Sequence, residues 1–174
     1  MLRGIPGKQP DCGRDVYIAD SAEIIGDVVI GDDSSVWFGS VVRGDISPVR
    51  IGERTNIQDR CVIHVAGNKQ TPMVIGSDVT IGHGAIVHAC IVSDRVLVGM
   101  GAIILDGAQI GSDSIVGAGS LVTKGSVFPP GSVIMGSPAR IVRKAEEKDI
   151  EMIRRSCEHY LELRGIYPEF RIDG

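Results

Sequence analysis

Residues 98–122 read VGMGAIILDGAQIGSDSIVGAGSLV, and within them an aliphatic residue returns at every sixth position, at Val98, Ile104, Ile110, Val116 and Val122. Earlier rows with the same spacing begin at Ile18, Ile24, Ile30, Val36, Val42, Ile51, Ile57, Ile63, Ile75, Ile81, Val87 and Val92. A period of six is neither helical nor the simple alternation of a strand. It is typical of a solenoid in which each row supplies a short strand and a tight corner.

The composition fits a narrow solenoid interior. Of 174 residues, 43% are hydrophobic and 23 are glycine, yet Phe, Trp and Tyr number only three, one and three. Stacked rows bury a continuous aliphatic column, and each row is supported mainly by its neighbours. Aromatic rings would not fit this interior, whereas glycine suits its corners. We therefore expect an all-β solenoid.

Charge and hydropathy exclude several classes of partner. With 18 basic and 22 acidic side chains the formal net charge is −4, which gives no electrostatic footprint for nucleic acid. The uncharged stretch 79–93 is interrupted by Gly82 and His83 and falls short of the roughly 18 apolar residues that indicate a membrane span. The first residues lack the apolar run of a secretion signal, so we expect a cytoplasmic protein. The scattered cysteines are expected to be packing residues: Cys12, Cys61, Cys90 and Cys157.

The six-residue rhythm ends near the C-terminus. It loosens at Pro129-Pro130 and stops at Gly136-Ser137-Pro138-Ala139. From about Lys144 to Arg164 the chain is rich in charge, and its apolar residues recur at helical spacing: Ile150, Ile153, Cys157 and Leu161. We expect a solenoid domain over residues 1–143 and, over 144–174, an amphipathic helix and tail that pack on it.

The rows resemble the hexapeptide-repeat, left-handed β-helix superfamily over about residues 10 to 165. The resemblance implies a left-handed parallel β-helix with three rows to each turn of a triangular prism. It also implies a trimer.

Three rows to a turn would bring Arg43, His64 and His88 into one vertical stack. Each follows the aliphatic residue of its row and points outward, and the rows lie one coil apart on the same face. Adjacent strands are about 4.8 Å apart, a separation at which two imidazoles can share one metal ion. His83 belongs to another face. A threefold trimer would let His83 of a neighbouring subunit complete the site, because three histidines and an open position are the usual catalytic zinc pattern.

Several segments carry a closer resemblance: Arg43-Gly44-Asp45, Asn56-Ile57-Gln58-Asp59, His64 and Gly82-His83-Gly84-Ala85-Ile86-Val87-His88. In their residues and spacing they resemble the gamma-class carbonic anhydrases and their bacterial homologues. The resemblance implies a homotrimeric enzyme that hydrates carbon dioxide to bicarbonate with a metal-bound hydroxide at the trimer interface.

The same resemblance implies roles for single residues. His64 and His88 of one subunit would bind zinc or ferrous iron with His83 of the next, and such ligands also accept cobalt. Gln58 would orient the metal-bound water. Around the subunit interface, Arg43 would pair with Asp45 and Asp59. From the stacking alone, Asp59 would lie directly beneath His83 and could support it as a hydrogen-bond acceptor.

Two departures from the family pattern predict slow turnover. Efficient members carry one glutamate just after the Arg-Gly-Asp segment, where this chain has Ile46, and another on an acidic loop after the first histidine. The corresponding loop here, Ala66 to Met73, contains no acid. Hydroxide is regenerated by exporting a proton, so the loss of both groups should slow the reaction. Tyr160 or His159 could substitute only if the helix folds back over the site; otherwise His159 is expected to be exposed.

Two other functions remain open. Hexapeptide-repeat acyltransferases that use acyl-coenzyme A share this solenoid, often carry a segment like Gly136-Ser137-Pro138-Ala139, and use one histidine as a general base. The stack of His64 on His88 argues against this function, because a base needs a single imidazole. A non-catalytic, metal-binding trimeric scaffold is the other alternative.

Overall fold

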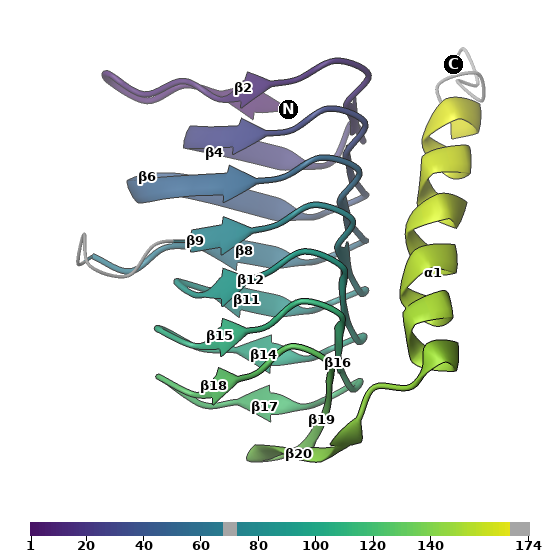
Figure 1. Ribbon diagram of the computed structural model, residues 1–174. Helices are drawn as coiled ribbons and strands as arrows, with labels where there is room; N and C mark the ends of the chain where they lie inside the picture. Colours follow the sequence, from purple (N-terminus) through teal and green to yellow (C-terminus); the bar gives the residue numbers. More distant parts are fainter. Residues whose placement is uncertain (68–72, 168–174) are drawn as a thin grey trace.

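A computed structural model describes residues 1–67 and 73–167, and over these the chain winds as a left-handed parallel β-helix with one helix along its side (Figure 1). The elements in chain order are β1 (Leu2–Arg3), β2 (Asp11–Cys12), β3 (Tyr17–Ile18), β4 (Glu23–Ile30), β5 (Ser35–Val36), β6 (Val41–Ile51), β7 (Asn56–Ile57), β8 (Val62–His64), β9 (Met73–Ile75), β10 (Thr80–Ile81), β11 (Ile86–His88), β12 (Ile91–Val92), β13 (Val96–Val98), β14 (Ile103–Ile104), β15 (Gln109–Ile110), β16 (Ser114–Val116), β17 (Leu121–Val122), β18 (Val127–Phe128), β19 (Ser132–Gly136), β20 (Ala139–Lys144) and α1 (Glu147–Ile166).

The pairing register confirms three rows to each turn. In β13 and β16, Val98 pairs with Val116, and in β14 and β17 Ile104 pairs with Val122. Each residue therefore stacks on the residue three rows later. Within the described ranges the strands form a 12-stranded and an 8-stranded sheet, and every strand pair is parallel except β19 with β20. The regular register follows from the sequence period, because a slip by one residue would turn each aliphatic side chain out of the core.

The interior is the expected aliphatic column, but it extends further than Val122. Phe128 and Ile134 continue the six-residue spacing, and Ile134 of β19 still stacks in parallel on Val116. Phe128 is an aromatic residue in the core, contrary to expectation; it lies in the last full coil and is 8% exposed. Burial raises the pKa of Cys61 to about 11, so this thiol stays neutral, as a packing residue does.

Strands β4 and β6 are longer than their neighbours and lie very close together at Gly26 and Gly44. A Cβ on Gly44 would come within 2.3 Å of the Asp27 carbonyl oxygen, so only glycine allows this approach. The pairing of β4 with β6 keeps one register up to Gly44, which pairs with Gly26, and then shifts at an irregularity, so that Val28 pairs with Val49. Asp45 is the first residue of β6 after this close approach.

Helix α1 starts at Glu147, not at Lys144 as the charge pattern predicted, because Lys144 is the last residue of β20. Glu146 is the N-cap, and the carboxylate of Asp149 accepts its backbone N–H in a capping box. Arg143 of β20 donates to the same carboxylate at 2.9 Å.

The apolar stripe of α1 packs on the 8-stranded sheet, as expected. Ile153 and Cys157 are buried against the solenoid, whereas Ile150 is 37% exposed at the edge of the stripe. Near the C-terminal end of α1, Arg164 pairs with Asp33. The helix is thus tied to the solenoid at both ends. No helix in the described part of the chain is long and apolar enough to cross a membrane.

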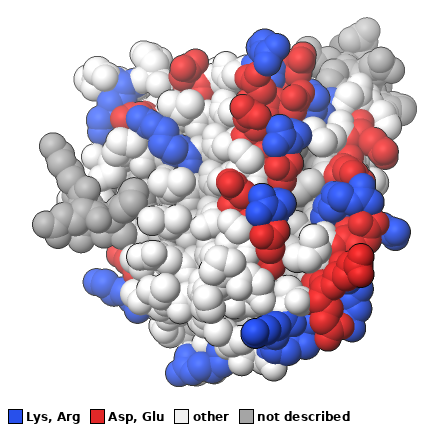
Figure 2. Space-filling view, viewed as in Figure 1, with Lys and Arg blue, Asp and Glu red and all other residues white. Residues whose placement is uncertain are grey.

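Charged side chains form a vertical ladder along the solenoid corner that faces the viewer in Figure 2. It includes three ion pairs between successive coils: Arg14 with Asp32, Arg54 with Asp78, and Arg95 with Asp113. Each pair brings opposite charges together, so the ladder alternates in sign along the coils.

The contacts at the start of α1 predict that Asp149 stabilises the docked helix. We expect Asp149→Ala to cost about 1–2 kcal/mol, because it removes a capping interaction and the carboxylate to which both terminal nitrogens of Arg143 donate. Hydrogen–deuterium exchange of the α1 amides should then be about tenfold faster. Glu158→Gln is the matched control, since its exposed ion pair with Arg154 contributes about 0.5 kcal/mol or less. Equal exchange in the two variants would contradict this account.

Candidate metal centre

The predicted stack of Arg43, His64 and His88 is present. Arg43 of β6 pairs in register with His64 of β8, which pairs in register with His88 of β11. The chain between these residues is longer than a plain coil, yet the strand ladder brings them back to the same position on the face. The buried residue before each of them anchors the strand, so the three side chains point outward together.

A continuous chain of polar contacts runs through this stack. Arg43 donates to Asp45, whose Oδ1 lies 3.0 Å from Nε2 of His64. Nδ1 of His64 lies 3.2 Å from Nε2 of His88. Nδ1 of His88 in turn lies 2.5 Å from Oδ1 of Asp106. Each histidine therefore has one nitrogen on a carboxylate and the other facing the second histidine.

The facing nitrogens have the separation that one metal ion requires. Two nitrogens, each 2.0–2.1 Å from a tetrahedral zinc ion, lie about 3.3 Å apart. The observed distance between His64 Nδ1 and His88 Nε2 is 3.2 Å. The donors are imidazoles whose outer nitrogens contact carboxylates, an arrangement that is usual around metal-binding histidines. The pair thus fits a divalent cation such as zinc, iron(II) or cobalt(II).

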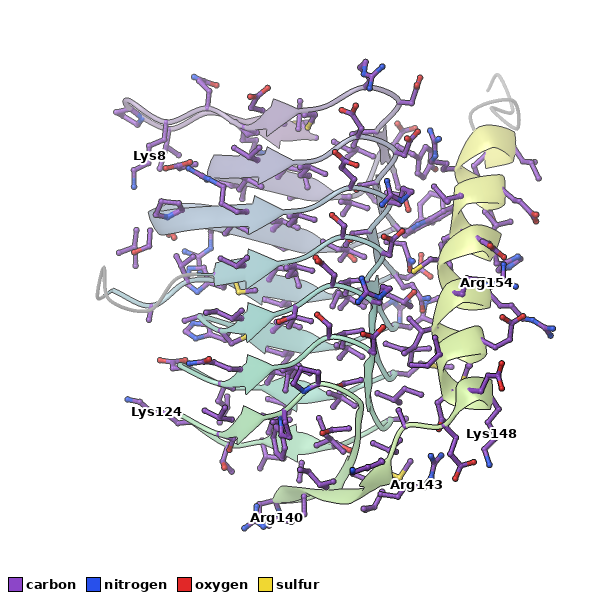
Figure 3. All side chains as sticks on the ribbon, in the orientation of Figure 1. Lys8, Lys124, Arg140, Arg143, Lys148 and Arg154 are labelled. Carbon is purple, nitrogen blue, oxygen red and sulfur yellow. The ribbon has the colours of Figure 1, made fainter. Side chains whose placement is uncertain are left out.

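Partial burial by itself would raise the pKa of Asp45. The hydrogen bonds from His64 and Arg43 outweigh this effect and hold the pKa below its ordinary value. Asp45 is therefore ionised at neutral pH and acts as an acceptor for both neighbours. The backbone carbonyl of Asp45 accepts a hydrogen bond from Lys8 at 2.6 Å. Lys8 is labelled at the upper left of Figure 3.

His83 lies away from this stack, on the corner between the two sheets, as the row count predicted. Its Nδ1 is 2.7 Å from Oδ2 of Asp59, which occupies the coil before it. Asp59 therefore contacts His83 within this chain, and Arg43 pairs with Asp45. The His83 side chain is 42% exposed. Within the described residues of one chain, no three His, Cys, Asp or Glu side chains converge to hold an ion.

Gln58 lies beside His83 and is almost fully buried. Its Oε1 accepts the backbone N–H of His83 at 3.1 Å, and its Nε2 lies 3.4 Å from Oδ1 of Asn56. Asn56 in turn donates to Thr80 at 2.9 Å. This buried amide network places an uncharged side chain next to a predicted metal ligand.

Helix α1 does fold back over the His83 corner. The Tyr160 hydroxyl lies 3.4 Å from Nε2 of His83, and its ring packs edge-on against Trp37 with centroids 5.2 Å apart. Burial raises the pKa of Tyr160 to about 12, so the phenol is protonated at neutral pH. It can donate a hydrogen bond, but it cannot take up a proton as a base. His159 is exposed, as expected.

Sequence reasoning missed Asp106 and the partners of Tyr160. Asp106 lies in the coil after His88 but one position beyond the residue in register with it, because Val87 pairs with Ile104. The stacking rule that aligned the histidines points to Leu105 and so does not find Asp106. Trp37, Phe38 and Tyr167 gather near Tyr160, although aromatic residues are rare in this chain. No periodic signal marks these contacts, because they depend on where α1 docks.

Comparison with known proteins gives relatives along nearly the whole chain. The family model "Bacterial transferase hexapeptide (six repeats)" matches residues 89–124. The chain is 47% identical to "Carbonic anhydrase" of Geobacillus kaustophilus, and the match covers 96% of this chain and 91% of the relative. It is 48% identical to "Probable carbonic anhydrase" of Methanocaldococcus jannaschii, with coverages of 91% and 98%. It is 42% identical to "Gamma carbonic anhydrase 2, mitochondrial" of Arabidopsis thaliana, of which it spans 61%.

A solved structure shares the whole fold. The crystal structure of a hexapeptide transferase family protein from Anaplasma phagocytophilum matches with a TM-score of 0.90 at 40% identity, covering 96% of this chain and 98% of that one. The chain is similar over more than nine-tenths of the length of two relatives named "Carbonic anhydrase" and "Probable carbonic anhydrase". It also carries stacked histidines on a six-residue repeat. The chain therefore belongs to the gamma carbonic anhydrase family of hexapeptide-repeat proteins.

Proposed function

We propose that the protein is a homotrimeric, metal-dependent carbonic anhydrase that interconverts carbon dioxide and bicarbonate. In this proposal His64 and His88 of one subunit and His83 of the next hold zinc, with iron(II) or cobalt(II) as alternatives. The observation that carries it is the pair of imidazole nitrogens 3.2 Å apart on an outward face, in a chain whose relatives are named carbonic anhydrases.

The chemistry needs a nucleophile at neutral pH and a site that does not neutralise it. A bound divalent ion supplies the Lewis acidity that turns water into such a nucleophile. Neutral imidazoles hold the ion without cancelling its charge. Gln58 is an uncharged amide beside His83, so it can orient a water by hydrogen bonding without compensating the ion.

Proton export is the step that we expect to limit the rate at this site. Ile46 is aliphatic and half-exposed where efficient family members have a glutamate, and the loop from residue 66 to 73 contains no acid. Tyr160 touches His83, but with its pKa raised to about 12 by burial it holds its proton at neutral pH. Turnover is therefore expected to be slow and to depend on buffer as the proton acceptor.

The trimer is supported by apolar side chains around the histidines. Val62 is 39% exposed and Ile86 is 38% exposed in the single chain, and both lie on the strands that carry His64 and His88. Met100, on the coil that follows His83, is 62% exposed. A neighbouring copy that placed its His83 corner on the face of Val62 and Ile86 would bury both side chains and bring its own His83, with the Met100 beside it, toward the stack.

The proposed function is tested by carbon dioxide hydration, measured by stopped flow with a pH indicator. Protein purified with and without oxygen is analysed for metal, stripped with a chelator, and reloaded with zinc, iron(II) or cobalt(II). We expect activity only in loaded protein, and a rate that rises with imidazole buffer concentration. Loaded protein that released thiol from acyl-coenzyme A would instead be an acyltransferase. A loaded trimer inactive in both assays would be a scaffold.

Gln58→Ala should lose most carbon dioxide hydration while it keeps the trimer and its metal content. The expected loss is about 10²-fold or more in kcat, the size found when one positioned hydrogen-bonding group is removed from a reacting centre. Kinetics and metal analysis on the same sample check this. Unchanged turnover would remove Gln58 from the mechanism, and loss of metal would show that it acts by supporting the His83 backbone.

Ile86→Asp should dissociate the trimer, because it places a charge in the middle of the apolar face. Sedimentation velocity should show a monomer, and metal analysis of the same sample should find no stoichiometric metal. Val127→Asp is the matched control, since Val127 is 65% exposed on β18, on another face of the prism. A trimeric Ile86→Asp variant would rule out this face as the interface.

A further inference from the structure

We propose that Asp106 is a positioning residue that fixes which nitrogen of His88 faces the metal ion. The inference rests on the metal site of the proposed function and concerns a residue to which neither the repeat nor the family resemblance gave a role. Asp106 lies on the corner after β14, one coil beyond β11, which ends at His88.

The contact between the two side chains is short and partly shielded. Oδ1 of Asp106 is 2.5 Å from Nδ1 of His88, and the two side chains are 32% and 30% exposed. A carboxylate that is ionised only accepts hydrogen bonds, so the proton of the neutral imidazole must sit on Nδ1. Nε2 is then left with a free lone pair, and it points at His64.

His64 is held in the opposite tautomer. Its carboxylate partner is Asp45, which contacts Nε2 at 3.0 Å and thereby places the proton there. The lone pair of His64 is consequently on Nδ1. Two lone pairs thus face one another across 3.2 Å, an arrangement that repels in the absence of a cation and becomes favourable with one.

Asp45 and Asp106 differ in the number of side chains that share each carboxylate. Asp45 is shared between Arg43 and His64. Among the described residues, His88 is the side chain with which Asp106 forms its ion pair or hydrogen bond. Asp106 should therefore be the stronger of the two in orienting its ring and in raising the basicity of the ligating nitrogen.

Zinc affinity of the full-length protein, measured by competition with a chromophoric chelator, tests the proposal. Asp106→Ala should weaken zinc binding by about 10- to 100-fold, the range found when a hydrogen-bond partner of a metal-bound histidine is removed. Asp106→Asn should recover the part of this loss that is due to ring orientation, because its amide oxygen can accept the same hydrogen bond but carries no charge. Asp113→Ala is the control, since that aspartate pairs with Arg95 away from the histidines.

Nitrogen-15 spectra of the imidazole rings in zinc-loaded protein give a second readout that does not depend on activity. The proposal predicts that His88 binds zinc through Nε2 with its proton on Nδ1, and that His64 binds through Nδ1. Asp106→Asn should keep this pattern. If Asp106→Ala fails to fold, the wild-type and Asp106→Asn spectra carry the test.

Two results would overturn the role of Asp106: wild-type zinc affinity in a folded Asp106→Ala trimer, or zinc bound to Nδ1 of His88. Either could occur in an active carbonic anhydrase. Conversely, a protein that binds zinc as described but does not hydrate carbon dioxide would refute the proposed function and leave the role of Asp106 intact.

Discussion

The hydrogen-bonded ladder between successive coils is the interaction on which the rest of the structure depends. It sets a spacing of about 4.8 Å between strands, and at this spacing each outward side chain lies directly over its counterpart in the next coil. His64 and His88 come from such consecutive strands, and their ring nitrogens meet at 3.2 Å. The same ladder stacks Asp59 on His83, and it places Asp106, one position beyond the counterpart of His88, within reach of the His88 ring. The site is thus a consequence of the register more than of any single loop.

The ladder also explains why insertions do not disturb the site. Strand β6 extends beyond Arg43, and extra residues follow β8, so the histidines are not separated by a regular number of residues. Pairing nevertheless restores Arg43, His64 and His88 to one column, because the aliphatic residue before each must return to the core. The extra residues of β6 therefore do not alter the stack. Gly44 contributes by letting β4 and β6 approach closely beside Asp45.

The six-residue repeat predicted the fold and the stack of Arg43, His64 and His88. Both depend on the backbone register, and the spacing of the aliphatic residues determines that register. Phe128 in the core was not predicted, because the scarcity of aromatic residues argues against aromatic rings in the interior, whereas Phe128 is only 8% exposed there. The start of α1 was misplaced because the capping contacts of Asp149 decide it, and charge density does not. The contact of Tyr160 with His83 depends on how α1 docks, which no repeat encodes.

The central claim is that one ion is shared between the His64–His88 pair of one subunit and His83 of its neighbour. Coexpression of His83→Ala with the double variant His64→Ala/His88→Ala tests it most directly, by zinc content per chain. Each variant alone should bind no stoichiometric zinc. The coexpressed population should recover about one quarter of the wild-type content, since random assembly pairs intact partners at about one interface in four. A mixture that stays empty, or His83→Ala protein that keeps its zinc, would contradict the shared site.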